Sequence, residues 1–101
     1  MVVLLARFSL RPDGLDPFQE ATEALLDELA ASGQAPMQFE WFCDAEEPGR
    51  VVILERHANP EAAEAHFASP AVTRWQAAVR SLYAAPVEAW QLIPQGSHVA
   101  E

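Results

Sequence analysis

Four short stretches of the chain alternate between apolar and polar residues, which is the pattern of β-strands. They span residues 2–11, 37–44, 50–57 and 86–94. In the first stretch one alternate set is wholly apolar and is expected to face a core: Leu4, Ala6, Phe8 and Leu10. The opposite set begins apolar and becomes polar, so that face is expected to be partly exposed. The third stretch begins apolar on both faces, which indicates a sheet covered on both sides.

Apolar residues recur at helical spacing in two other regions of the chain. The first region begins at Asp16, an expected N-cap followed by proline, and ends at Gly33. The second region contains the same cap-then-proline signal twice, at Asn59 and at Ser69. These two signals predict consecutive helices over residues 61–68 and 71–84.

The predicted order β-α-β-β-α-β is that of the ferredoxin-like folds. It implies an α+β fold, with a four-stranded antiparallel sheet and the helices on one face. We expect one domain over residues 1–94 and a polar tail over residues 95–101. The uncovered sheet face would then carry several apolar residues: Val3, Leu5, Phe42, Val52, Leu54 and Leu92. Since such a face usually has a partner, we expect a homodimer that packs sheet to sheet, a dimeric α+β barrel.

Composition and charge exclude several classes of protein. Half of the 101 residues are hydrophobic and 21% are charged, which argues against disorder. The formal net charge of −9 leaves no basic patch for nucleic acid or for an anionic membrane surface. No apolar run approaches the ~20 residues that span a bilayer, and the N-terminus does not resemble a secretory signal. The single cysteine, Cys43, excludes an intrachain disulfide and fits a cytoplasmic location.

His66 is the best single candidate for chemistry. It lies in the segment EAAEAHF, where small alanines leave space beside it. An imidazole that titrates near neutrality can act as a general base or can hydrogen-bond a ligand oxygen. The competing interpretation is a partly buried histidine bonded to the backbone.

Other residues could complete a binding site around His66. Glu55 and Arg7 could be polar groups on inward strand faces, although a cross-strand ion pair is the competing interpretation. Four aromatic residues could line an apolar pocket: Trp41, Phe67, Trp75 and Trp90. Ordinary core packing is the alternative for these rings, and the two interpretations are compatible.

Bound cofactors and metals have little support in the sequence. The four glycines are not clustered, so no phosphate-binding loop for a nucleotide or flavin is expected. His57 and His66 lie nine residues apart with no third ligand assigned near them, so a metal centre would require long-range assembly. Cys43 is expected to be a buried structural thiol. We therefore predict no cofactor and no metal.

Several motifs resemble the antibiotic biosynthesis monooxygenase (ABM) domain family. They are Leu54-Glu55-Arg56-His57, then Pro60-Glu61-Ala62, and then Ala65-His66-Phe67-Ala68-Ser69-Pro70-Ala71-Val72. The resemblance extends more weakly over residues 1–94, and it implies the same dimeric α+β barrel. The chain departs from the family pattern at His57, where a tryptophan is common, and at Ala71, where several relatives carry a second histidine.

The resemblance implies a cofactor-free oxygenase that oxidises a small aromatic substrate, of the quinol, anthrone or polyketide-like type, with O₂. His66 would be the base or the orienting donor, and Trp41, Phe67 and Trp75 would form pocket walls. Haem degradation is not expected, because the first strand lacks the asparagine of the haem-degrading members. One alternative is a non-catalytic, small-molecule-binding or stress-related protein of the same fold, and another is a different enzyme of this fold, such as an isomerase or a haem protein.

Overall fold

The computed structural model describes residues 1–100 of the chain. Its strands are β1 (Val2–Ser9), β2 (Gln38–Cys43), β3 (Arg50–His57) and β4 (Glu88–Leu92). Its helices are α1 (Leu15–Ser32), α2 (Pro60–Ala68) and α3 (Pro70–Val79), and a 3₁₀ helix, η1 (Arg80–Leu82), follows α3. Every predicted strand and helix is present. The main difference lies at the end of α3, where the chain tightens into η1 instead of continuing as an α-helix to residue 84.

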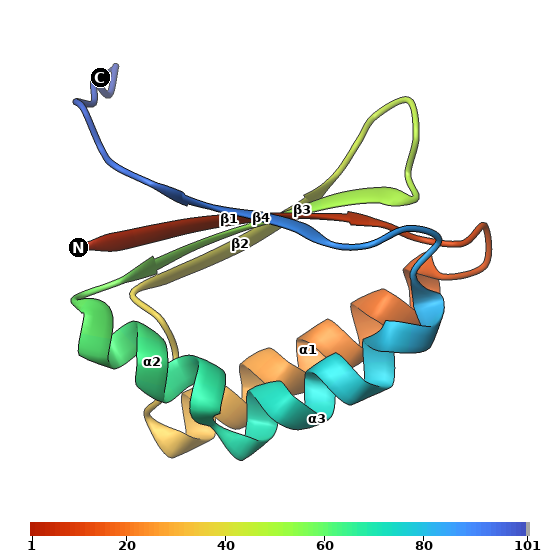
Figure 1. Cartoon of the computed structure of the whole chain (residues 1–101), viewed down its shortest axis with the longest axis horizontal. Helices are drawn as coiled ribbons and strands as arrows, with labels where there is room; N and C mark the ends of the chain where they lie inside the picture. Colours follow the sequence, from red (N-terminus) through yellow and green to blue (C-terminus); the bar gives the residue numbers. More distant parts are fainter. Residues whose placement is uncertain (101) are drawn as a thin grey trace.

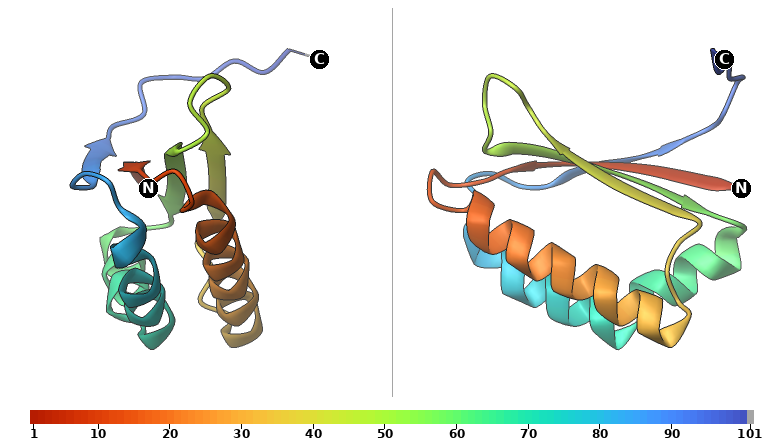
Figure 2. Two further views of the ribbon diagram at one scale, coloured as in Figure 1. Left: turned by 90° about the vertical axis from the view of Figure 1, so that its right-hand side faces the viewer. Right: turned by 180° about the vertical axis from the view of Figure 1, so that it is seen from behind.

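The four strands form one antiparallel sheet in the order β2-β3-β1-β4. The last strand returns to the edge beside the first, which is the ferredoxin-like arrangement, so the predicted α+β fold class is confirmed. All three α-helices lie on one side of the sheet (Figure 1). An end-on view shows two layers, with α1 beside the α2–α3 pair beneath the strands (Figure 2).

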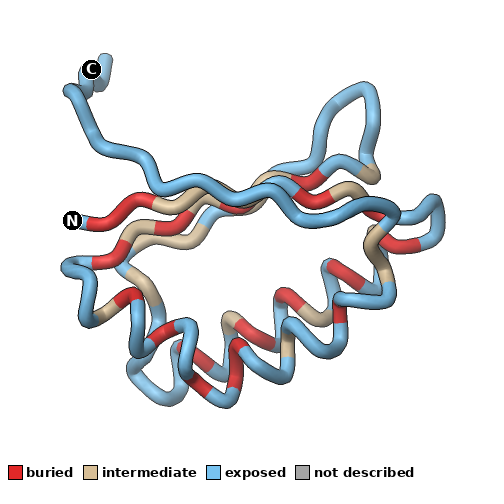
Figure 3. The backbone as a smooth tube through the Cα atoms, viewed as in Figure 1, coloured by how far each residue is buried: buried red, intermediate tan, exposed pale blue. Residues whose placement is uncertain are grey.

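The main core lies between the sheet and the helices. Phe8 and Val51 are directly opposite in the pairing of β1 with β3, and both are buried. Phe18 from α1 and Val79 from α3 pack against them, and neither is exposed to solvent. Buried residues recur along all three α-helices (Figure 3), and a second cluster packs between α1 and α3: Leu25, Leu29, Ala71 and Val72. The expectation that the even-numbered residues of the first strand face a core is therefore correct.

Capping residues set the start of α2 and of α3. Asn59 Oδ1 accepts the backbone N–H of Ala62 at 2.8 Å, and Ser69 Oγ accepts that of Val72 at 3.4 Å. Both residues have extended backbone and are followed by proline at the first helical position. The two predicted caps are confirmed, and they fix the direction in which the chain turns back from β3 beneath the sheet.

The ends of α1 were predicted with mixed success. Gly33 ends the helix in the left-handed conformation, with a φ of 72°, as expected. The prediction that Asp16 is the N-cap is wrong, because α1 begins at Leu15, after Gly14. Asp16 lies instead in the first turn, where its charge favours the positive end of the helix dipole.

No helix or strand of residues 1–100 covers the sheet face opposite the helices (Figure 1). Of its apolar side chains, Phe42, Trp90 and Leu92 are 51%, 43% and 41% exposed. Such exposure of large apolar side chains on one face is what the sequence predicted for the dimer surface. Within residues 1–100, no helix has the length and the hydrophobicity needed to cross a bilayer.

Candidate functional site

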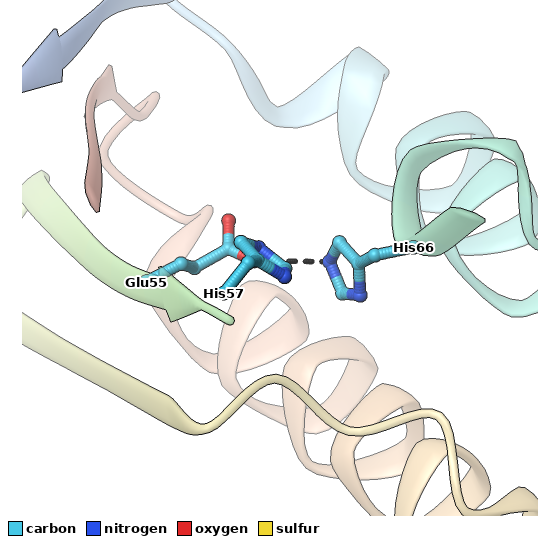
Figure 4. Close-up of side chains that lie close together, drawn as sticks. All are labelled: Glu55, His57 and His66. Carbon is cyan, nitrogen blue, oxygen red and sulfur yellow. Dashed lines mark ion pairs between the residues drawn. The ribbon is translucent and has the colours of Figure 1, made fainter. Parts of the chain in front are cut away.

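Three buried polar side chains meet between the sheet and α2: Glu55, His57 and His66 (Figure 4). Strand β3 supplies two of them, because alternate residues of a strand point to the same face. Its inward positions are Val51, Ile53, Glu55 and His57, and all four are buried. The inward face of β3 thus changes from apolar to polar half-way along the strand.

Helix α2 supplies the third side chain, His66. The Asn59 cap starts this helix directly after β3, and its buried residues are Ala63 and His66, which are three positions apart and share one face. The end of the helix holds the backbone at His66, since Ser69 Oγ donates a hydrogen bond to the His66 carbonyl oxygen at 2.6 Å. The imidazole is therefore fixed at the point where α2 turns into α3.

The contacts within this cluster are short, but several of its polar atoms make no hydrogen bond. Glu55 Oε1 lies 2.9 Å from His66 Nε2 and 3.4 Å from His57 Nε2. These distances suit ion pairs, yet the groups are not aligned as hydrogen bonds. Among residues 1–100, Glu55 Oε1, His57 Nε2 and His66 Nδ1 are buried and have no hydrogen-bond partner. Buried polar atoms of this kind are rare in native structures and are a frequent mark of functional sites.

The surroundings of His57 shift the pKa of its imidazole. Burial lowers the pKa of His57 below its ordinary value of 6.5, an effect that Glu55 opposes and His66 reinforces. His57 is therefore biased towards the neutral imidazole. A carboxylate close to two imidazoles can orient one of them and favour a single tautomer. Histidines that act in general acid–base catalysis are commonly oriented in this way.

A cavity of about 250 Å³ adjoins the cluster, and we call it the histidine cavity. His57 and His66 form one part of its wall. The rest is formed by the loop between α1 and β2, over residues 33–37, and by alanines of the β3–α2 turn and of α2. The prediction that small alanines leave space beside His66 agrees with this lining, since Ala62 and Ala65 belong to it.

A larger hollow, of about 640 Å³, lies on the other side of α2. Val2 and Leu4 of β1 line it together with Phe67, and we call it the Phe67 groove. The Phe67 ring is 41% exposed, and its centroid lies 5.0 Å from that of His66. Phe67 thus connects the polar cluster with the groove, which fits its predicted place in a pocket wall.

Of the three predicted tryptophans, Trp41 and Trp75 are partly buried and pack against the apolar core, whereas Trp90 is exposed on the open sheet face. The ring of Trp41 lies 5.8 Å from that of Phe18, and the ring of Trp75 packs edge-on against Phe8 and Phe18. Trp75 Nε1 donates a hydrogen bond to Thr22 Oγ1 at 3.1 Å. Neither ring lines the histidine cavity or the Phe67 groove. Trp75 instead lines two other hollows, one of about 380 Å³ beside Phe8 and Tyr83 and one of about 190 Å³ between α1 and α3. The role of both rings as substrate contacts stays a prediction.

Glu55 and Arg7 are not brought together. Glu55 points towards the helices, as predicted, but Arg7 lies on the opposite sheet face. There it pairs with Glu88 at 2.6 Å, directly across the β1–β4 ladder. The expectation of an inward Arg7 is thus wrong, and the competing interpretation of a cross-strand ion pair is correct for it. A strand's period of two places any odd-numbered residue of β1 on the face away from the helices.

Three further residues were misjudged from the sequence. His57 was not assigned to the site, and Glu55 was not recognised as the third ligand-type residue, although it lies two positions before His57 and so on the same strand face. The statement that no third ligand lies near the two histidines is therefore wrong. Cys43 is exposed instead of buried, because it is the last residue of the edge strand β2.

Comparison with known proteins assigns the family. The sequence model of the antibiotic biosynthesis monooxygenase (ABM) family matches residues 1–78, a span that includes the whole polar cluster. The chain belongs to this family. Membership supports a monooxygenase-like function in general terms, whereas no curated protein matches the sequence.

Solved structures share the fold of this ABM protein. The crystal structure of an antibiotic biosynthesis monooxygenase has a TM-score of 0.84 and 17% identity, with 95% of this chain and 100% of that chain covered. Rv0793 from Mycobacterium tuberculosis has a TM-score of 0.82 and 26% identity, with 97% and 98% covered. A conserved protein from Methanosarcina mazei Go1 has a TM-score of 0.81 and 13% identity, with 90% and 89% covered.

Proposed function

We propose that this ABM protein is a cofactor-independent monooxygenase that oxidises a small, electron-rich aromatic substrate of the quinol, anthrone or polyketide-like type with O₂. The observation that carries the proposal is the buried Glu55–His66 pair beside the histidine cavity. A phenol needs little more than the loss of a proton to become a strong reductant. The chain offers a candidate base, a neighbouring carboxylate and an adjoining cavity, which together suit that chemistry.

His66 is the proposed base and Glu55 the residue that positions it. Glu55 Oε1 lies 2.9 Å from Nε2 without the alignment of a hydrogen bond. We propose that this contact aligns when substrate binds, as catalytic hydrogen bonds often do, and that it then favours the tautomer with the proton on Nε2. Nδ1 then keeps its lone pair, and this atom has no hydrogen-bond partner within the protein. It is the atom that would accept the phenolic proton of the substrate.

The substrate itself supplies the electrons in this reaction. Its deprotonated ring adds O₂, one oxygen atom stays in the product, and the other leaves as water. The histidine cavity, at about 250 Å³, lies near the lower end of the usual range for ligand pockets, about 300–1,000 Å³. That size favours a small aromatic substrate, and the adjoining Phe67 groove offers apolar surface for a larger one.

Oxygen uptake tests the proposal directly. Chelator-treated protein is mixed with a panel of hydroquinones and anthrones, with no cofactor added, and O₂ consumption is recorded. We expect protein-dependent uptake that falls by about 10²–10⁴-fold in His66→Ala, the usual contribution of a general base. His98→Ala is the matched control, because His98 is exposed in the tail.

Two results would count against the oxygenase. If no substrate of the panel is consumed, but a quinol binds and quenches tryptophan fluorescence, the protein is a small-molecule-binding member of the fold. If uptake is unchanged in His66→Ala, the base lies elsewhere.

The proposal includes a homodimer that buries the open sheet face, and a cytoplasmic location where the exposed thiol of Cys43 stays reduced. The exposed rings of Phe42 and Trp90 support a sheet-to-sheet contact. Size-exclusion chromatography with light scattering should give about twice the chain mass. Leu54→Arg, at the centre of this face, should give the monomer mass, whereas Gln19→Arg, on the exposed side of α1, should not. A wild-type monomer at micromolar concentration would exclude the dimer.

A further inference from the structure

We infer that Glu55, His57 and His66 form a binding site for one divalent transition-metal ion, such as Zn²⁺ or Fe²⁺, and that the bound metal competes with the use of His66 as a base. Two imidazoles and one carboxylate are a donor set found in catalytic zinc sites and in non-haem iron sites. The ligand atoms of the three residues all lie within 4.8 Å of one another.

The spacing of the two imidazoles from the Glu55 carboxylate fits a metal. A metal bound at about 2.0–2.2 Å to nitrogen and oxygen holds neighbouring donors roughly 2.8–3.6 Å apart, for angles from about 90° to about 109°. Glu55 Oε1 lies 2.9 Å from His66 Nε2 and 3.4 Å from His57 Nε2. Both distances fall inside that range. The remaining pair of donors, one nitrogen of each imidazole, lies within 4.8 Å, and rotation of an imidazole would adjust that separation when an ion binds.

The poor alignment of these groups as hydrogen bonds also supports a metal site. Glu55 Oε1 and His57 Nε2 are buried, lie near each other and have no hydrogen-bond partner. A shared proton would require a nitrogen and an oxygen to point along one line, whereas a metal requires lone pairs that converge on a common point. The side chains of all three residues meet between β3 and α2 (Figure 4), and their ligand atoms lie within 4.8 Å of one another, which is compatible with the second arrangement.

The charge of Glu55 supports a cation at this place. Burying a carboxylate is costly unless it is paired with a positive charge. Among residues 1–100, the ion-pair partners of Glu55 are the two imidazoles alone, and the arginines that form ion pairs, Arg7, Arg50 and Arg74, pair with other carboxylates. A divalent ion would neutralise the carboxylate, and the histidine cavity, whose wall includes both imidazoles, would admit it.

Metal binding has a consequence for the proposed function. Coordination would take the Nε2 lone pair of His66 and would alter the tautomer on which the base role depends. The metal-free protein would then be the active form of the cofactor-independent oxygenase, and the metal would act as an inhibitor. The existence of the site does not depend on the oxygenase, since binding can be measured without a substrate.

Calorimetric titration of Zn²⁺ into chelator-treated protein tests the site. We expect one ion per chain in the wild type and an affinity that falls by more than about 100-fold in Glu55→Gln and in His57→Gln, because loss of a direct ligand should exceed the 10–100-fold effect of an outer-shell change. His98→Ala should bind as the wild type does. Co²⁺ absorption should show bands typical of a nitrogen and oxygen ligand set, and the melting temperature should rise with Zn²⁺ only where the three residues are intact.

The alternatives give different results. Zn²⁺ binding that survives in Glu55→Gln and His57→Gln but is lost in His98→Ala would overturn the inference. So would a wild-type affinity for Zn²⁺ no higher than that of the folded Glu55→Gln variant. Circular dichroism establishes that each variant is folded before it is titrated. Oxygen uptake is then measured with and without Zn²⁺. Uptake in the metal-free protein that Zn²⁺ does not reduce would overturn the competition but would leave the proposed oxygenase intact.

Discussion

The two ends of the helix–sheet interface differ in the kind of residue that they bury. At one end Phe8, Phe18 and Val51 pack together, with ring centroids of the two phenylalanines 5.4 Å apart. At the other end Glu55 and His66 occupy the same layer, close together but without aligned hydrogen bonds. Strand β3 contributes to both ends, so the difference arises within a single strand.

The apolar end holds the fold together, whereas the polar end is kept at the expense of stability. Burying aromatic and aliphatic side chains is the main favourable term in folding. Burying polar atoms without partners is unfavourable, and natural proteins tolerate it chiefly where function requires it. Substitutions at the two ends should therefore have opposite effects on stability and on activity.

The largest expected effect lies at the apolar end. Phe18→Ala should lower the free energy of unfolding by about 3–5 kcal/mol, because a fully buried ring is replaced by a cavity. Chemical denaturation monitored by circular dichroism measures the loss. Phe67→Ala is the control, since Phe67 is 41% exposed and should cost much less. Equal losses would mean that the apolar end is not the centre of stability.

The polar end should respond in the opposite direction. Combining Glu55→Leu, His57→Leu and His66→Leu should raise the free energy of unfolding by about 1–4 kcal/mol, as replacement of buried ionic groups by apolar ones of similar volume can do. The triple variant should consume no substrate and bind no Zn²⁺. Chemical denaturation of the triple variant, monitored by circular dichroism, measures the change. A folded variant less stable than the wild type would show that the polar cluster contributes to stability.

A smaller effect on stability is expected from the hydrogen bond between Thr22 and Trp75. Thr22 is fully buried, and its hydroxyl accepts the N–H of the half-buried Trp75. Thr22→Val keeps the shape and leaves that donor without its partner, which should cost about 1 kcal/mol. Thr22→Ser retains the acceptor and serves as the control for the hydrogen bond. If Thr22→Val is as stable as the wild type in thermal melts, the indole N–H does not need this partner.

The smallest effect should come from the exposed hairpin loop, outside both ends. The backbone N–H groups of Glu46 and Glu47 lower the pKa of Asp44 below its ordinary value of 3.8. A carboxyl whose pKa is lowered by folding stabilises the protein above its unfolded pKa, and this contribution is lost as the pH falls through the folded value. Asp44→Asn should therefore reduce stability slightly at pH 7 and not at pH 2. A difference that persists at pH 2 would indicate another cause.

Much of the fold could be predicted from local patterns. The alternation in β1 and β3 gave the inward faces, and the cap-then-proline signals at Asn59 and Ser69 gave the starts of two helices. The error at Asp16 has a local cause, since a good capping residue followed by proline fits the first helical turn as well as the N-cap position. The end of α3 was missed because helical spacing does not distinguish a last α-turn from a 3₁₀ turn.

The candidate site could be predicted only in part. The sequence by itself determined the fold class, the buried face of each element and the prominence of His66, because these follow from periods of two and 3.6 residues and from composition. The outward face of Arg7 already follows from the alternation in β1. The tertiary structure alone decided that Glu55 and His57 meet His66, and that Trp41 and Trp75 pack against the core. Those outcomes depend on how α2 crosses beneath β3, and the distances between atoms on different elements are not contained in the period of either one.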